Sequence, residues 1–224
     1  MISTVFIDVD DTLLDFHEGA KDAMKRGFLE AGLTYKKEMF ETFSTINDSL
    51  WRKIETKEIT RDELYRIRWK LVFDAISIDF DGEEFEEIFL RMLRTSSVPV
   101  PYAIELMQYL SGKYTVCVAS NAPHDQQLLR MENVGLTPYI DHVFTSERFG
   151  YEKPSVKFFD CCFDILKDVK KDQVIIIGDS VTADIKGGID YGIKTCWFNY
   201  RNKPAQGIQP DYTIDKLEDL LKIL

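Results

Sequence analysis

The sequence lacks the features that mark several common protein classes. No apolar run approaches the roughly 20 residues of a membrane-spanning helix. Asp8 comes too early for the hydrophobic core of a signal peptide. The 28 Lys and Arg are outnumbered by 38 Asp and Glu, giving a net charge of −10. That balance argues against nucleic-acid polymers and membranes as partners.

Cysteine and histidine are also scarce. The four cysteines show no Cys-x-x-Cys spacing and the three histidines are scattered, which disfavours a disulfide framework and a histidine-based zinc site. A chain of 224 residues can bury a core without such staples. We therefore expect a cytoplasmic protein with reduced cysteines.

Helical periodicity dominates residues 16–96. Apolar residues recur there at i, i+3 and i+4 in four successive stretches. The segment Thr60 to Glu63 has the pattern of a capping box that opens the third helix. The residues of that helix expected to face inward are Leu64, Ile67, Leu71 and Ala75.

After Pro99 and Pro101 the pattern changes to alternating strands and helices. The strands are short and almost continuously apolar, which is typical of a parallel sheet covered on both faces. We predict an α/β fold, a Rossmann-like core of residues 1–15 and 97–224 with an inserted all-helical domain over 16–96. The expected strands are 4–9, 114–120, 142–145, 173–177, 194–198 and 212–214.

Polar side chains gather where these strands end. Ligands of parallel α/β sheets bind beyond the carboxyl ends of the strands, so we expect these side chains to converge at one edge. A lysine in the loop before a later helix joins them. The residues concerned are Asp8, Asp10, Ser120, Asn121, Lys153, Asp179 and Asp184.

Carboxylates that converge repel one another unless a cation binds them. An all-oxygen cluster suits Mg²⁺, which we expect as the cofactor. A carboxylate beside Mg²⁺, with a lysine and a hydroxyl nearby, is suited to phosphoryl transfer. Attack by Asp8 would form an aspartyl-phosphate, and Asp10 could protonate the leaving oxygen and then activate water.

Four segments together resemble the motifs of the haloacid dehalogenase-like (HAD) hydrolases. Asp8–Leu13 resembles their DxDxT[LV] motif, Val116–Asn121 their apolar strand ending in Ser or Thr, and Lys153-Pro154 their lysine motif. Gly178–Ser180 with Asp184 resembles GDSxxxD. The order and spacing match across the whole chain, and the helical insert resembles a type 1 cap.

This resemblance implies roles for the acids. Asp8 would be the nucleophile and Asp10 the general acid/base. Asp8, Asp179 and the backbone carbonyl of Asp10 would hold Mg²⁺, and Asp184 would support the lysine or a metal-bound water. The presence of Asp10 separates the chain from the dehalogenases proper, which lack that second acid.

The resemblance also implies where a phosphoryl group binds. Ser120 and Lys153 would contact it, with Asn121 as a further candidate that could instead cap the following helix. Phe16 follows the catalytic strand closely and is our candidate for a specificity residue near the leaving group. Asp11 and Asp15 are expected to be structural.

A narrower resemblance is to the pyrimidine 5′-nucleotidases, and it implies a nucleoside 5′-monophosphate as substrate. Ala122 departs from that group, which more often has glycine there. The supporting segments are Leu50-Trp51, Glu58–Thr60 with Arg66 and Trp69, Gly188-Ile189 with Gly192, and Thr195–Asn199.

Several alternatives stay open. Other enzymes of this kind are sugar-phosphate or phosphoglycolate phosphatases and β-phosphoglucomutase-like enzymes. A non-catalytic phosphate-responsive regulator is an alternative of another class. Arg66 and Arg68 could contact substrate, although surface salt bridges are the simpler interpretation. The partner is expected to be a small phosphorylated metabolite, and the protein a monomer or homodimer.

Overall fold

The computed structural model describes residues 1–224 and divides the chain into two compact units. The first unit, the core unit, comprises Met1–Asp15 and Val98–Leu224, and the second, the helical unit, is Phe16–Ser97. The helical unit is thus inserted between the first strand and the rest of the core unit.

The core unit is built on a six-stranded sheet in which every neighbouring pair is parallel. The strand order is β3-β2-β1-β4-β5-β6, which confirms the α/β class and the Rossmann-like core. Each strand lies within two residues of its expected bounds. The strands are β1 (Thr4–Ile7), β2 (Thr115–Ser120), β3 (His142–Thr145), β4 (Val174–Gly178), β5 (Lys194–Phe198) and β6 (Tyr212–Ile214).

Helical segments connect these strands and cover both faces of the sheet. Between β4 and β5 the chain forms a π-helix followed by a short α-helix, and the last segment is a 3₁₀ helix. The segments are α5 (Ala103–Leu110), α6 (His124–Asn133), η1 (Thr137–Tyr139), α7 (Ser146–Phe149), α8 (Val156–Leu166), η2 (Lys171–Gln173), η3 (Val181–Lys186), α9 (Gly187–Tyr191) and η4 (Leu217–Lys222).

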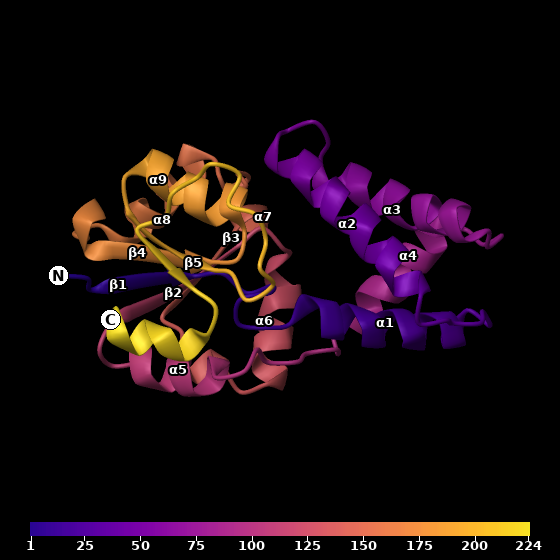
Figure 1. Cartoon of the computed structure of the whole chain (residues 1–224), viewed down its shortest axis with the longest axis horizontal. Coiled ribbons are helices and arrows are strands. Elements are labelled where there is room, and N and C mark those ends of the chain that lie inside the picture. The colour runs from indigo at the N-terminus through magenta and orange to yellow at the C-terminus, as the bar shows by residue number, and fades with distance from the viewer. The chain divides into compact units, whose positions relative to one another are not determined.

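Side chains of β1 alternate between the two faces because the period of a strand is two residues. Val5 and Ile7 join a cluster with residues of α5, α6 and η4, whereas Phe6 joins a cluster with residues of α8 and α9. Figure 1 shows α5 on one side of the sheet and α8 and α9 on the other. Every residue of β1 is therefore buried, as its apolar run predicts.

Strand β1 lies at the point where the strand order reverses. The chain builds outward from β1 to β2 and β3 on one side, then crosses to β4, β5 and β6 on the other. Ile7 pairs with Val118 of β2 and Ile177 of β4. Residues that follow β1, β2 and β4 consequently meet at one edge, where doubly wound sheets bind ligands.

The helical unit packs four helices around aromatic side chains. The ring centroid of Trp69 lies 4.4 Å from that of Phe85 and 5.1 Å from that of Phe43, so these aromatics are core residues. Thr60 and Glu63 form the expected capping box. The helices are α1 (Phe16–Glu30), α2 (Met39–Glu55), α3 (Arg61–Ile76) and α4 (Gly82–Leu93).

Three expectations for α3 are wrong. Leu71 is 42% exposed rather than inward-facing, and Ala75 is exposed as well. Arg68 lies inward instead, 1% exposed, where its guanidinium binds both carboxylate oxygens of Glu86 and the side-chain oxygen of Asn47. A guanidinium can be buried when its donors are matched in this way, so Arg68 forms an internal ion pair and not the surface salt bridge that we expected.

None of the helices is both long and apolar enough to cross a bilayer. All four cysteines are free thiols, of which Cys117, Cys162 and Cys196 are buried. The three buried cysteines belong to the apolar clusters that pack on the sheet.

Candidate active site

The chain turns tightly after β1 and presents Asp8 and Asp10 at the end of that strand. The backbone N–H of Leu14 donates to the carbonyl of Val9 at 2.8 Å. Asp11 closes the turn in the left-handed region, with φ 57°, a conformation that aspartate tolerates better than most residues. The two acids therefore project from a constrained turn.

A loop after β5 holds this turn in place. The Tyr200 hydroxyl donates to Asp11 Oδ1 at 3.1 Å. Arg201 Nη2 donates to Asp11 Oδ1 at 3.1 Å and to Asp15 Oδ1 at 2.8 Å. These contacts tie Asp11 and Asp15 to the loop after β5.

Lys153 lies at the centre of the carboxylate groups. Its Nζ donates to Asp8 Oδ1 at 2.8 Å, to Asp184 Oδ1 at 2.6 Å and to the carbonyl of Ala119 at 2.5 Å. An ammonium has three protons, so these contacts use its full donor capacity. Since Lys153 is only 1% exposed, its charge is directed entirely at the site.

Asn121 fixes the backbone that carries this lysine. The Lys153 N–H donates to Asn121 Oδ1 at 2.8 Å, and Asn121 Nδ2 donates to the Lys153 carbonyl at 2.9 Å. The N-terminal cap position of α6 is Pro123, so Asn121 links the ends of two loops and is not the cap of the helix.

The end of β4 brings two further acids to the same place. Asp179 directly follows the strand, and Asp184 accepts a hydrogen bond from the Ser180 N–H at 3.1 Å. A Cβ at Gly178 would lie 2.1 Å from Asp184 Oδ2. Glycine is therefore required at the strand end for Asp184 to reach Lys153.

Asp8, Asp179 and Asp184 form a cluster that fits a hard cation. One carboxylate oxygen from each lies within 4.8 Å of the others. The donors are all oxygen, which is what Mg²⁺ prefers. Lys203, from the loop after β5, donates to Asp179 Oδ2 at 2.7 Å, so two lysines offset part of the charge of three carboxylates.

The carboxyls of this cluster are so deeply buried that desolvation outweighs the attraction of the two lysines. Burial raises the pKa of Asp8 and of Asp179 to about 7 and that of Asp184 to about 6, against the attraction of Lys153 and Lys203. Desolvation alone would lower the pKa of Lys153, but Asp184 and Asp8 raise it. A cation bound among the acids would offset the remaining repulsion.

Asp10 belongs to a second polar group, held by α6. Gln127 Nε2 donates to Asp10 Oδ2 at 2.7 Å and to Ser120 Oγ at 2.9 Å. Arg130 Nη1 donates to Asp10 Oδ1 at 2.5 Å and to Gln127 Oε1 at 3.1 Å. Gln127 thus connects the two predicted site residues Asp10 and Ser120.

The structure brings most of the predicted site residues together. Those in the core unit are joined by the contacts above: Asp8, Asp10, Ser120, Asn121, Lys153, Asp179 and Asp184. Phe16 is the first residue of α1 and belongs to the helical unit. Its role in specificity stays a prediction.

Sequence reasoning missed Gln127, Arg130 and Lys203. For the first two a signal existed, because Gln127 and Arg130 are three residues apart on a helix and so share a face. That face carries polar residues where a helix packed on a sheet normally carries apolar ones. Lys203 lies in an irregular loop, where no periodicity points to a contact.

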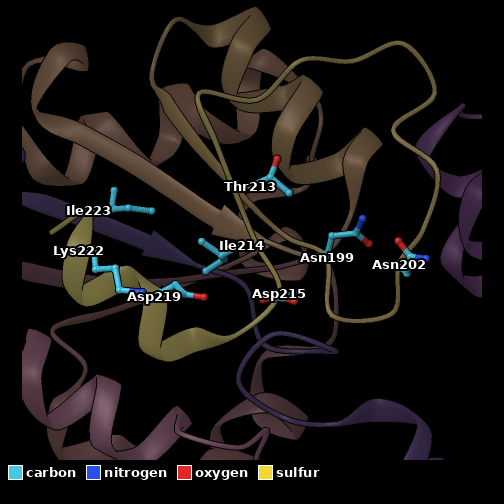
Figure 2. A pocket seen from close by; sticks show the side chains of 8 residues that line it. All are labelled: Asn199, Asn202, Thr213, Ile214, Asp215, Asp219, Lys222 and Ile223. Carbon is cyan, nitrogen blue, oxygen red and sulfur yellow. Dashed lines mark hydrogen bonds and ion pairs between the residues drawn. The ribbon is translucent and has the colours of Figure 1, made fainter.

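A separate groove of about 430 Å³ lies where β5 and β6 end (Figure 2). None of its lining residues belongs to the carboxylate cluster or to the Asp10 group. The groove is lined by Asn199, Asn202, Thr213, Ile214, Asp215, Asp219, Lys222 and Ile223.

The sequence matches a known family over most of its length. The family model of the haloacid dehalogenase-like hydrolases matches residues 2–192. YfnB of Bacillus subtilis (strain 168), named as a HAD-hydrolase, is 34% identical, with 99% of this chain and 94% of YfnB covered. A crystal structure of YfnB, described as bound to magnesium and as revealing interdomain movement, is similar with a TM-score of 0.95 and 33% identity, covering 100% of this chain and 98% of that one.

Two further relatives carry names that state an activity. The pyrimidine 5′-nucleotidase YjjG of Escherichia coli (strain K12) is 29% identical, with 98% of this chain and 96% of that protein covered. The pyrimidine 5′-nucleotidase PynA of Streptococcus pneumoniae (strain ATCC BAA-255 / R6) is 29% identical, with coverage of 98% and 94%. The chain belongs to the haloacid dehalogenase-like hydrolases, and within that family it is a phosphatase.

Proposed function

We propose that this phosphatase is a Mg²⁺-dependent nucleoside 5′-monophosphatase, with pyrimidine nucleotides as its preferred substrates. The observation that carries the proposal is the position of Asp8, which directly follows β1 and lies beside Lys153, within the cluster of three acids. The names of YjjG and PynA, two relatives matched over nearly their whole length, support the substrate class.

The acids would hold the metal ion. Asp8 and Asp179 are the proposed carboxylate ligands, together with the backbone carbonyl of Asp10. Asp184 would hold Lys153 in position through its hydrogen bond with the ammonium. When bound, Mg²⁺ supplies positive charge that stabilises the phosphoryl oxygens and lowers the repulsion between the acids and the substrate.

Asp8 would act as the nucleophile. One of its carboxylate oxygens forms a bond to phosphorus while the bond from phosphorus to the 5′ oxygen breaks, which leaves an aspartyl-phosphate. Asp10 donates a proton to the departing 5′ oxygen, so that the nucleoside leaves as an alcohol. Lys153, Ser120 and Asn121 are the proposed contacts of the phosphoryl group.

The second displacement regenerates the enzyme. Asp10, now a carboxylate, removes a proton from a water molecule, whose oxygen attacks phosphorus as the bond to Asp8 breaks. Inorganic phosphate is released and Asp8 is a free carboxylate again. One acid thus serves both steps, first as a donor and then as an acceptor of the proton.

The helical unit is the proposed cap that selects the leaving group. A cap that closes over a site excludes bulk water and contacts the part of the substrate that the core does not bind. Phe16, the first residue of α1, is the proposed specificity residue of this unit. The interdomain movement described for YfnB supports a cap that moves.

We also propose a cytoplasmic location. Four free thiols in one chain are typical of a reducing compartment. A thiol-trapping experiment on the protein inside cells would detect disulfides if the compartment were oxidising.

A substrate panel with phosphate release as the readout tests the proposed activity. We expect uridine, cytidine and thymidine 5′-monophosphates to give a higher kcat/KM than purine nucleotides, sugar phosphates and phosphoglycolate. Asp8→Asn is the control for background phosphatase. A higher kcat/KM on a sugar phosphate would overturn the nucleotide assignment, and isomerised sugar phosphate without phosphate release would indicate a mutase.

A further inference from the structure

Helix α6 carries a buried polar face toward Asp10. Gln127 and Arg130 are both fully buried, with 0% exposure. They lie three residues apart, so their side chains share a face of the helix. Together they donate to both carboxylate oxygens of Asp10, Gln127 to Oδ2 and Arg130 to Oδ1.

The surroundings of Arg130 do not favour the stability of the fold. The only ion pair of Arg130 is with Asp10, and its Nε and Nη2 are buried without a hydrogen-bond partner. Unsatisfied donors on a buried charge destabilise a protein, and an apolar side chain in the same space is often the better solution for stability. The presence of an arginine at this buried position is therefore explained by a requirement other than packing.

We propose that Arg130 and Gln127 are positioning residues that set the direction of the Asp10 carboxylate for proton transfer. The proposal rests on the function proposed above, in which Asp10 is the general acid and base. Each carboxylate oxygen has two lone-pair directions, so one on each stays available for the leaving oxygen or for water. Because proton transfer requires the donor within hydrogen-bond reach, a carboxylate free to rotate would be less effective.

Gln127 adds a link to the phosphate-binding side of the site. Its amide nitrogen also donates to Ser120 Oγ, and the Ser120 oxygen accepts from the Ala122 N–H at 3.1 Å. A single amide therefore sets the distance between the group that handles the proton and the hydroxyl proposed to contact the phosphoryl group.

The leaving group separates positioning from a merely structural role. p-Nitrophenolate leaves readily without a proton, whereas the 5′ oxygen of a nucleoside needs one. We expect Arg130→Met to lower kcat/KM on uridine 5′-monophosphate by a factor at least about ten times larger than on p-nitrophenyl phosphate. This is part of the roughly 10²–10⁴-fold that general acid catalysis contributes, because the variant misplaces Asp10 without removing it. Gln127→Leu should show the same split to a smaller extent.

Two further variants make the result decisive. Adding Arg130→Met to Asp10→Asn should cause no further loss on the nucleotide, because residues that act as a unit are not additive. Arg68→Met is the matched control, since it removes another fully buried arginine, in the helical unit, that touches neither Asp10 nor Gln127. It should change both substrates by the same factor.

The outcomes distinguish this inference from the proposed function. If Asp10→Asn shows the split between substrates and Arg130→Met and Gln127→Leu do not, the function stands and the positioning role is wrong. If Asp10→Asn shows no split, or the wild-type enzyme hydrolyses neither substrate, the proposed function fails and the inference fails with it. Should Arg130→Met not fold, Gln127→Leu alone decides.

Discussion

Lys153→Met tests whether the lysine offsets the charge of the buried acids. The ammonium contacts Asp8, Asp184 and the carbonyl of Ala119 at 2.5–2.8 Å, and it is 1% exposed. Methionine is apolar and of comparable length, so the change removes a charge while altering the packed volume little. Two carboxylates then lose a direct partner in an environment that water barely reaches.

The expected loss is large compared with the stability of a whole domain. Removing one partner of a buried ion pair costs about 3–5 kcal/mol, because the remaining charge is left uncompensated. Domains are stable by only about 5–15 kcal/mol. We expect Lys153→Met to lower the free energy of unfolding by about 3–5 kcal/mol at pH 8 and to abolish turnover.

Urea denaturation of a double-mutant cycle measures this effect. Asp184→Asn should destabilise the wild-type protein but stabilise the Lys153→Met variant, since there it removes an uncompensated carboxylate. Lys194→Met is the matched control, because Lys194 pairs with Asp211 at an exposed position. Its removal should change the free energy of unfolding only slightly. A double variant less stable than Lys153→Met alone would refute the reasoning.

Three further results are expected. Asp8→Asn should abolish phosphate release with an unchanged circular dichroism spectrum, and residual turnover above background would remove Asp8 as nucleophile. Burial raises the pKa of Asp8 and Asp179 from 3.8 to about 7, and that of Asp184 from 3.8 to about 6. The folded protein therefore binds protons more tightly than the unfolded chain does. With a chelator present, the free energy of unfolding should fall as the pH rises from about 4 to 7. Mg²⁺ should therefore raise Tm more at pH 8 than at pH 5.5, and an equal shift, measured by calorimetry, would contradict this. Glu86→Gln should lower the free energy of unfolding, measured by urea denaturation, by about 3–5 kcal/mol, because it leaves the charge of Arg68 buried without a partner. The double variant Arg68→Met with Glu86→Leu should be nearly as stable as wild type. A small effect of Glu86→Gln alone would indicate that the pair behaves like a surface ion pair.

The sheet could be predicted because its strands have a distinctive composition. Buried parallel strands are apolar on both faces, so segments such as Val174–Gly178 are recognisable without any partner. The helices of the inserted unit were equally clear from their periodicity. Arg68 and Glu86 show where this method fails, because a charge that is matched inside a bundle has the same sequence pattern as a charge in water.

The site could be predicted where it depends on strand ends and not where it depends on tertiary pairing. Asp8 and Asp179 follow β1 and β4 directly, so the topology brings them together. Gln127 and Lys203 reach the site through a helix face and an irregular loop. Their contacts arise from how these elements pack, and no local pattern encodes that packing.

Asp8 and Asp10 are two residues apart, yet they meet different surroundings. The side chain of Asp8 is 12% exposed and bound by Lys153, whereas that of Asp10 is 29% exposed and bound by Gln127 and Arg130. In the proposed mechanism Asp8 is the nucleophile, which benefits from exclusion of water, while Asp10 as acid/base must reach both the leaving oxygen and the attacking water. Because the turn after β1 projects the two acids toward different elements, one short segment can supply both requirements, and substitutions in α6 should affect proton transfer without removing the nucleophile.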